Sequence, residues 1–202
     1  MTTMKPRNLP TTEWDEILQT ANQVPGVQVT VKRYSDPMTW LEAVIIFLGT
    51  LFNKSFKDGT AITLPALTKV EGVQHVSIFF PDRWISDAAA NLGTLRHELV
   101  HVDQILDLGV LRFYAKYALL PLPVLNTGRF ELEEEAYVIE AQFLLGAAQR
   151  PDLARDALRG ILLLGTGAYF WASSPAKAKA AHAVWERALF GEDAPKDPAD
   201  EL

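Results

Sequence analysis

The chain has 202 residues, of which 49% are hydrophobic and 22% are charged, and its formal net charge is −6 at pH 7. The hydrophobic content excludes a disordered protein, and the acidic balance argues against a protein that binds nucleic acid. Cysteine is absent, so imidazole and carboxylate groups are the side chains left to bind a metal ion. We expect one domain over residues 1–190 and an acidic, disordered tail over 191–202.

The spacing of apolar residues predicts an α+β fold that is mostly helical and has a small sheet. In chain order, the predicted elements are a helix over 12–22, a strand over 27–34, an apolar helix over 39–52, a short or irregular strand over 61–67, a strand over 73–80, a helix from residue 86 or 87 to Gly109, a helix over 113–120, a helix from about residue 133 to 148, and two helices over 151–170 and 175–190.

Two apolar runs, Leu41–Phe52 and Leu158–Trp171, are shorter than the roughly 20 residues that a membrane-spanning helix needs. We expect no transmembrane segment and two buried core helices. An exposed face on either helix would imply a partner, and a peripheral contact with a membrane surface stays open. The N-terminal residues lack the apolar core of a signal peptide, which favours a cytoplasmic location.

The pentapeptide His97-Glu98-Leu99-Val100-His101 points to metal chemistry. In a helix, His97 and His101 lie on one face a turn apart, and Glu98 lies about 100° further round. Two imidazoles with an adjacent carboxylate suit a metal-activated water. The chain has four His and thirteen Glu, so a chance match has odds of roughly one in two hundred. The alternative is a buried helix whose two His only form hydrogen bonds.

A third protein ligand is expected from a run of glutamates that begins 30 residues after His101, at Glu131, and includes Glu133, Glu134 and Glu135. Carboxylates suit the first turn of a helix, where they meet the positive end of its dipole. Alone, the run indicates a solvated start of a helix. With the His pair upstream, we expect one of these Glu to bind the metal, but periodicity does not choose between residues within one turn.

The stretch Leu95–Tyr137 resembles the gluzincin zinc metallopeptidases, and most closely a small, poorly characterised bacterial and phage branch. The shared pattern is His-Glu-x-x-His-Val-x-Gln, an aromatic-rich connector and Arg-x-x-x-Glu-x-Glu-Ala-Tyr. The resemblance implies a zincin-like fold in which His97, His101 and Glu133 bind zinc and Glu98 is the general base. It also implies that the chain hydrolyses peptide bonds of a peptide or protein substrate, and it allows a phage-associated location.

Two positions differ from the pattern of that family. Asp103 stands where stricter forms have a hydrophobic residue, and Tyr137 stands four residues after Glu133, where larger gluzincins often have an Asp. Glu131 and Glu134 are therefore kept as alternative third ligands. The alternative function is a catalytically silent metal-binding module of the same fold, with a structural or interaction role; hydrolysis of a non-peptide amide is a third.

Further predictions concern residues outside the ligand set. By likeness to gluzincins, the strand over 73–80 is an edge strand that could bind the substrate peptide, and the alternative is an ordinary strand of the sheet. His75 is expected on a sheet face, and His182 is expected to be a surface or packing residue. Arg129 is expected to pair with a neighbouring Glu. The candidates for a donor to the developing oxyanion are Tyr114, Tyr117, Arg129 and Tyr137, and the sequence does not choose between them.

Overall fold

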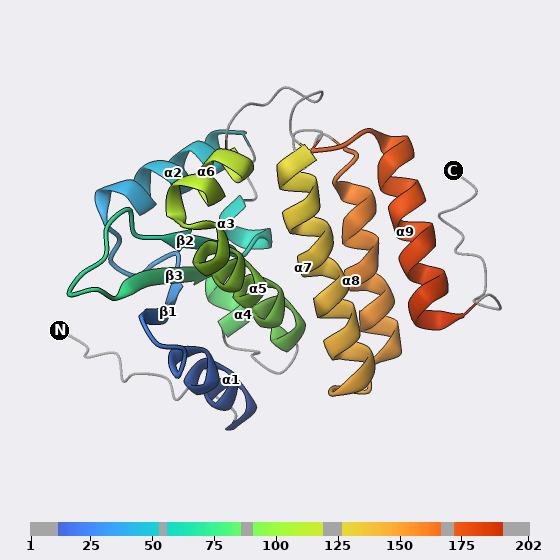
Figure 1. The fold of residues 1–202 in the computed structure, drawn as a ribbon, viewed down its shortest axis with the longest axis horizontal. Coiled ribbons are helices and arrows are strands. Elements are labelled where there is room, and N and C mark those ends of the chain that lie inside the picture. Colours follow the sequence, from blue (N-terminus) through green and yellow to red (C-terminus); the bar gives the residue numbers. More distant parts are fainter. Residues whose placement is uncertain (1–11, 53–55, 86–90, 119–126, 167–171, 192–202) are drawn as a thin grey trace. The chain divides into compact units, whose positions relative to one another are not determined.

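The structure is a computed structural model that describes residues 12–52, 56–85, 91–118, 127–166 and 172–191. It is an α+β fold, mostly helical, with a three-stranded sheet in the described part (Figure 1). The chain forms two compact units, Met1–Leu111 and Arg112–Leu202. The tail predicted over 191–202 lies almost wholly outside the described residues.

The first unit holds the sheet and the helices around it. Its elements are α1 (Thr12–Asn22), β1 (Val27–Arg33), α2 (Trp40–Phe52), α3 (Phe56–Gly59), β2 (Ile62–Pro65), β3 (Gln74–Phe80), α4 (Asp82–Ile85) and α5 (Leu92–Leu108). Helix α6 (Val110–Ala118) begins at the end of this unit and continues into the second, which also holds α7 (Thr127–Gly146), α8 (Pro151–Leu163) and α9 (Pro175–Phe190).

The strand order is β1-β3-β2, with β1 parallel and β2 antiparallel to β3. A tight turn between Val70 and Val73 connects β2 to β3, and its central residues Glu71 and Gly72 have φ of 51° and 80°. Two positive φ angles match the twist of antiparallel strands. The expectation that strand 73–80 lies at an edge is wrong: β3 is central. Its residues 78–80 are fully buried, as suits a strand covered on both faces.

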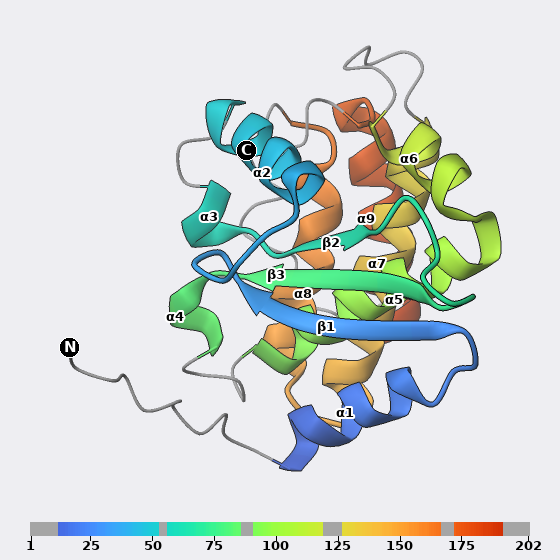
Figure 2. The ribbon, with the colours of Figure 1, turned by 90° about the vertical axis from the view of Figure 1, so that its left-hand side faces the viewer.

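Helices α2 and α5 cover opposite faces of the sheet. Successive side chains of a strand point to opposite sides, so neighbouring residues of β2 contact different helices. On one face, Leu64 and Phe79 pack against Ile46 of α2 in a buried cluster. On the other face, the neighbouring Thr63 bonds to Glu98 of α5. Figure 2 shows the three strands in front of α5. The strand β2 therefore connects the core under α2 with the polar residues of α5.

A partly buried ion pair joins α2 to β1. Glu42, the only acidic or basic residue of α2, is 7% exposed, and its carboxylate accepts hydrogen bonds from Lys32 Nζ at 3.0 Å and from the Thr39 backbone N–H at 2.7 Å. Burial by itself would raise the pKa of Glu42, but hydrogen bonds from Ser77, Thr39 and Lys32 hold it below its usual value. The charged form is therefore the one that the fold stabilises.

Helix α5 confirms the predicted helix around the His pair. It ends at Gly109, whose φ of 77° and N–H bond to the Ile105 carbonyl at 2.9 Å close the helix in a conformation that glycine adopts readily. Leu92, Leu95, Leu99 and Val102 form a buried stripe along the helix, and Leu106 in line with them is half-buried. Helix α5 begins at Leu92, after Asn91, and the start predicted at residue 86 or 87 lies outside the described residues.

In the second unit α7, α8 and α9 lie side by side (Figure 1). Their core includes Ala141, Leu158 and Ile161, each fully buried. Helix α7 begins at Thr127, not near Glu133, so the glutamates lie beyond its first turn and the helix dipole does not explain them. Phe130, 1% exposed, already belongs to the buried face, which is why the helix starts earlier than the glutamates suggest.

Helix α2 departs from the expectation that both apolar runs are buried. Ile46 is 1% exposed, but Trp40, Phe47 and Leu51 on the other side of the helix are 74%, 65% and 64% exposed. The second run begins as predicted, in buried residues of α8, and its part over 167–171 lies outside the described residues. Among the described helices, none is long and apolar enough to cross a bilayer.

We predict that Glu42→Gln weakens the acid dependence of stability. A carboxyl whose pKa is lowered by folding stabilises the fold above its unfolded pKa, and this stabilisation is lost as the pH falls through the folded pKa. Urea unfolding should show a loss of roughly 1–3 kcal/mol at pH 7. The difference from wild type should shrink towards pH 3. Glu16→Gln, at an exposed position, is the control; an unchanged difference at low pH would contradict the assignment.

We predict that Gly160→Ala destabilises the second unit. A Cβ at Gly160 would overlap the ring of Tyr137, so the α7–α8 contact must open, at a cost of roughly 1–3 kcal/mol. Gly146→Ala is the matched control, because a Cβ there meets nothing within 4 Å, and helix propensity should make it neutral or stabilising by up to about 1 kcal/mol. Thermal unfolding of both variants measures the difference, and equal melting temperatures would refute the close approach.

Candidate metal centre

Two buried imidazoles lie one turn apart on α5. His97 and His101 are 6% and 3% exposed, and their ring centroids are 5.1 Å apart with the planes at 81°. The spacing of four residues places both rings on one side of the helix, as the sequence predicts. Because a buried ring nitrogen without a partner is costly, the surroundings of each ring decide what the pair can do.

Gln104 orients the second of these rings. The Nδ1 atom of His101 lies 2.8 Å from Oε1 of Gln104, which is itself 6% exposed. With the amide oxygen as the acceptor, Nδ1 carries the proton, and Nε2 is then the ring nitrogen that can bind a cation. The sequence places Gln104 on the stripe of the two His, but the orienting role is visible only in the structure.

The carboxylate of Glu98 is buried and held by a hydroxyl from the sheet. Glu98 is 5% exposed, and the Thr63 hydroxyl donates to its Oε2 at 2.6 Å. Burial raises the pKa of the Tyr34 hydroxyl, and the negative charge of Glu98 raises it further. Sequence reasoning missed Thr63, because it precedes Glu98 by 35 residues and belongs to another element. No spacing signal marks it.

The candidate carboxylate ligand lies in the second unit. Glu133 on α7 is 2% exposed, and the hydroxyl of Tyr117 on α6 donates to its Oε1. The Tyr117 ring stacks on Phe113 with centroids 5.4 Å apart, and the guanidinium carbon of Arg129 lies 4.8 Å from the centre of the same ring. A stacked ring and a cation on its face fix the hydroxyl that orients Glu133.

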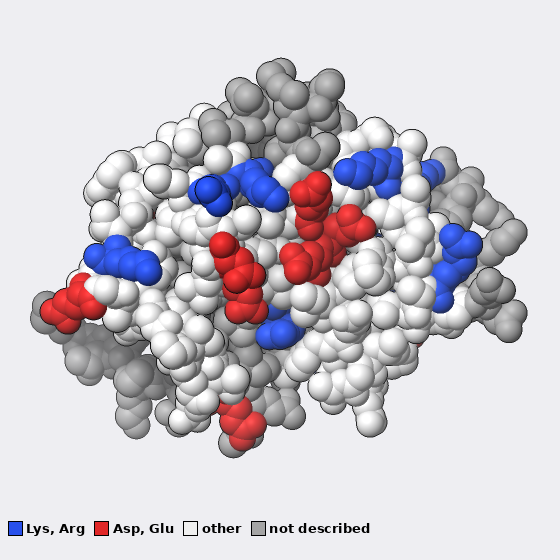
Figure 3. Space-filling view, viewed as in Figure 1, with Lys and Arg blue, Asp and Glu red and all other residues white. Residues whose placement is uncertain are grey.

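The other glutamates of the run have different partners. The side chain of Glu131 is 60% exposed and lies 3.6 Å from Lys116 Nζ. Glu134 Oε1 accepts a hydrogen bond from Trp185 Nε1 at 3.0 Å, which ties it to α9. Glu135 is exposed, and Figure 3 shows acidic side chains on the surface over α7. Burial and hydrogen-bond partners thus distinguish Glu133 from Glu131 and Glu134 as the candidate ligand, whereas sequence periodicity alone did not.

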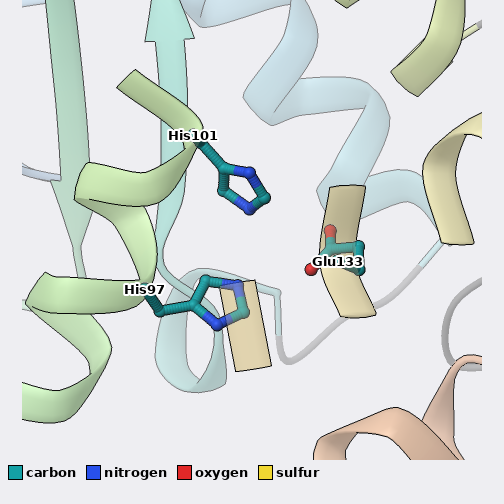
Figure 4. Close-up of side chains that lie close together, drawn as sticks. All are labelled: His97, His101 and Glu133. Atoms are coloured by element: carbon teal, nitrogen blue, oxygen red, sulfur yellow. The ribbon is translucent and has the colours of Figure 1, made fainter. Parts of the chain in front are cut away.

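His97, His101 and Glu133 form a buried group that could hold a metal ion. One ligand atom from each residue lies within 4.8 Å of the others, and all three side chains are drawn together in Figure 4. Two imidazole nitrogens and one carboxylate oxygen are a donor set that divalent metal ions accept. The donors are therefore of the kind that the sequence predicted, whichever ion binds them.

The remaining candidates have structural surroundings. Tyr137 packs its ring against Gly160 in the core of the second unit. His75 is half-buried on β3, as expected of a sheet-face residue. His182 is 5% exposed on α9, so it is a packing and not a surface residue, and its Nε2 has no hydrogen-bond partner among the described residues. Asp103, which departs from the family pattern, lies exposed on α5.

The chain was compared with models of protein families, with curated proteins and with solved structures. None of the three comparisons gives a match. The residues themselves and the geometry of the buried donor group are therefore what indicates a function.

Proposed function

We propose that this chain is a zinc-dependent metallopeptidase in which His97, His101 and Glu133 bind the metal and Glu98 is the general base. One observation supports the proposal most: three buried donors lie within 4.8 Å of one another, and a buried carboxylate follows the first of them in the chain. A merely structural role for the two His would not require a buried Glu beside them, since burying a carboxylate is costly without a function or a partner.

The donor set explains why zinc is proposed. Two imidazoles and a carboxylate would hold zinc, and the bound metal would supply an activated water by lowering its pKa to about 7. The contact of His101 Nδ1 with the Gln104 amide oxygen favours the tautomer that binds a metal through Nε2, and the Tyr117 hydroxyl donates to one oxygen of Glu133. Both contacts orient a ligand before any metal is bound, which strengthens binding by removing the cost of ordering the side chains.

Glu98 would act on the proton of the attacking water. The Thr63 hydroxyl donates to Oε2 at 2.6 Å, and this contact holds the carboxylate in position to accept the proton. A carboxylate fixed in one rotamer can accept the proton during attack on a carbonyl carbon and return it to the leaving amine. Thr63 is therefore a positioning residue for the base in this mechanism.

The substrate proposal follows from the strand order. Because β3 is paired on both sides, a peptide cannot extend the sheet there. Strand β2 lies at the edge of the sheet in the described part of the chain, and its Thr63 contacts Glu98. We propose that an extended peptide pairs with β2 by main-chain hydrogen bonds, which would place its backbone near the general base.

We predict that Glu133→Gln lowers zinc content well below one ion per chain, because the amide removes the anionic ligand. Glu134→Gln is the matched control: it changes the neighbouring residue, whose carboxylate bonds to Trp185, and should keep full zinc content. Tyr117→Phe should weaken zinc binding by about 10- to 100-fold, because it removes an orienting partner of the ligand. Elemental analysis and competition with a chelator measure both effects; equal zinc in wild type and Glu133→Gln would exclude this ligand.

We predict that Glu98→Gln keeps zinc but lowers hydrolysis of an unfolded protein or a peptide library by at least about 100-fold, since the base is lost and the ligands are kept. Glu135→Gln, at an exposed position, is the control and should remain active. Turnover by Glu98→Gln equal to wild type would remove Glu98 from the mechanism. Zinc-loaded wild type without hydrolysis would favour the silent metal-binding module. Tyr137 and Asp103, which differ from the gluzincin pattern, are the residues that motivate this alternative.

A further inference from the structure

Helix α2 presents a continuous apolar face to solvent. Its five exposed large side chains lie within about 100° of one another around the helix axis, given 3.6 residues per turn. They are Trp40, Val44, Phe47, Leu48 and Leu51, exposed by 74%, 45%, 65%, 45% and 64%. Single exposed hydrophobic residues are common on proteins, but five on one helical stripe form a patch that marks a binding surface. We call this stripe the α2 face.

The opposite side of α2 is fully used by the protein. Ile46, at 1% exposure, packs with Leu64 and Phe79, and Glu42 bonds to Lys32. These contacts fix the rotation of the helix, because turning the α2 face inward would move the buried Glu42 pair into solvent and break it. The fold therefore keeps the α2 face exposed, and a binding partner would have to cover it.

The area of the α2 face argues against a second copy of the chain as that occupant. Side chains of these types offer about 100–250 Å² each when fully exposed, so the five exposed fractions amount to about 600 Å². A stable dimer needs about 800 Å² per partner, with polar groups at the rim that form hydrogen bonds across it. The α2 face is smaller than this, and all five of its side chains are apolar or aromatic.

We propose that the α2 face is a docking surface for a lipid bilayer. A bilayer requires neither a minimum area nor a complementary shape, and it accepts a helix that lies in its surface with the apolar side 5–10 Å deep. Trp40, at the start of the helix, is the residue type that concentrates at the boundary between lipid and water. Helix α2 has 13 residues, which suits a helix lying along the surface and not across it.

The charge of this region defines the kind of membrane. The α2 face has no basic side chain, and Lys32, beneath the helix, is already paired with Glu42. The chain as a whole has a net charge of −6, so anionic headgroups would not attract it. Binding should therefore depend on the apolar contact. It should occur on zwitterionic lipid and should resist salt.

The test is flotation with phosphatidylcholine vesicles, using the full chain. Wild type should float with the vesicles at low salt and at about 0.5 M NaCl, because screening does not weaken an apolar contact. The double variant Phe47→Glu, Leu51→Glu should bind at least tenfold more weakly. The matched control is Leu111→Glu, Val184→Glu, at positions that are 77% and 54% exposed on other helices, and it should float like wild type.

A second measurement does not depend on the folding of the double variant. Brominated lipid should quench the tryptophan fluorescence of wild type, and quenching should fall in Trp40→Phe, although the chain keeps four of its five Trp. Wild type that stays in the lipid-free fraction, or a double variant that floats like the control, would overturn the proposal. So would a wild-type dimer that dissociates in the double variant, because a second copy would then cover the face. No metal or substrate is needed.

Discussion

The burial of polar side chains along α5 is the constraint on which the packing of the first unit depends. His97, Glu98, His101 and Gln104 are between 3% and 6% exposed, and each buried polar group costs about 1–3 kcal/mol if it lacks a partner. Thr63 supplies a partner for Glu98, which ties β2 to α5. Gln104 supplies one for His101. The positions of the strand and the helix are thus tied to the same hydrogen bonds that prepare the site.

The sequence predicts those parts of the site that depend on one helix alone. The His pair and the adjacent Glu98 follow from the spacing of residues in an α-helix, so no tertiary information is needed to place them. Thr63 and Tyr117 are different, because they lie 35 and 16 residues from the carboxylates that they hold. Whether a Thr or a Tyr donates to a buried carboxylate depends on how separate elements pack, which local periodicity does not record.

The same limit explains the predictions that are wrong. The hydrophobicity of β3 predicts that the strand is buried. Its central place in the sheet depends on parallel pairing with β1, whose residues lie 47 positions earlier in the chain. A run of Glu suggests the start of a helix, yet the buried Phe130 shows that the apolar face of α7 begins before the run. In α2 the apolar content is nearly uniform, so the pattern could not show which side faces solvent. The ion pair of the buried Glu42 with Lys32 decides which side faces the sheet.

The exposed α2 face and the buried polar residues of α5 lie on opposite faces of one sheet, and this arrangement makes their proposed roles compatible. Leu64 points to α2 and its neighbour Thr63 points to α5, so the strand alternation places the apolar α2 face and the Glu98 carboxylate on opposite sides. A bilayer that covered α2 would leave α5 directed away from the lipid. The sheet would then separate Glu98, the proposed general base, from the membrane contact, so the two proposed roles would not compete for one face.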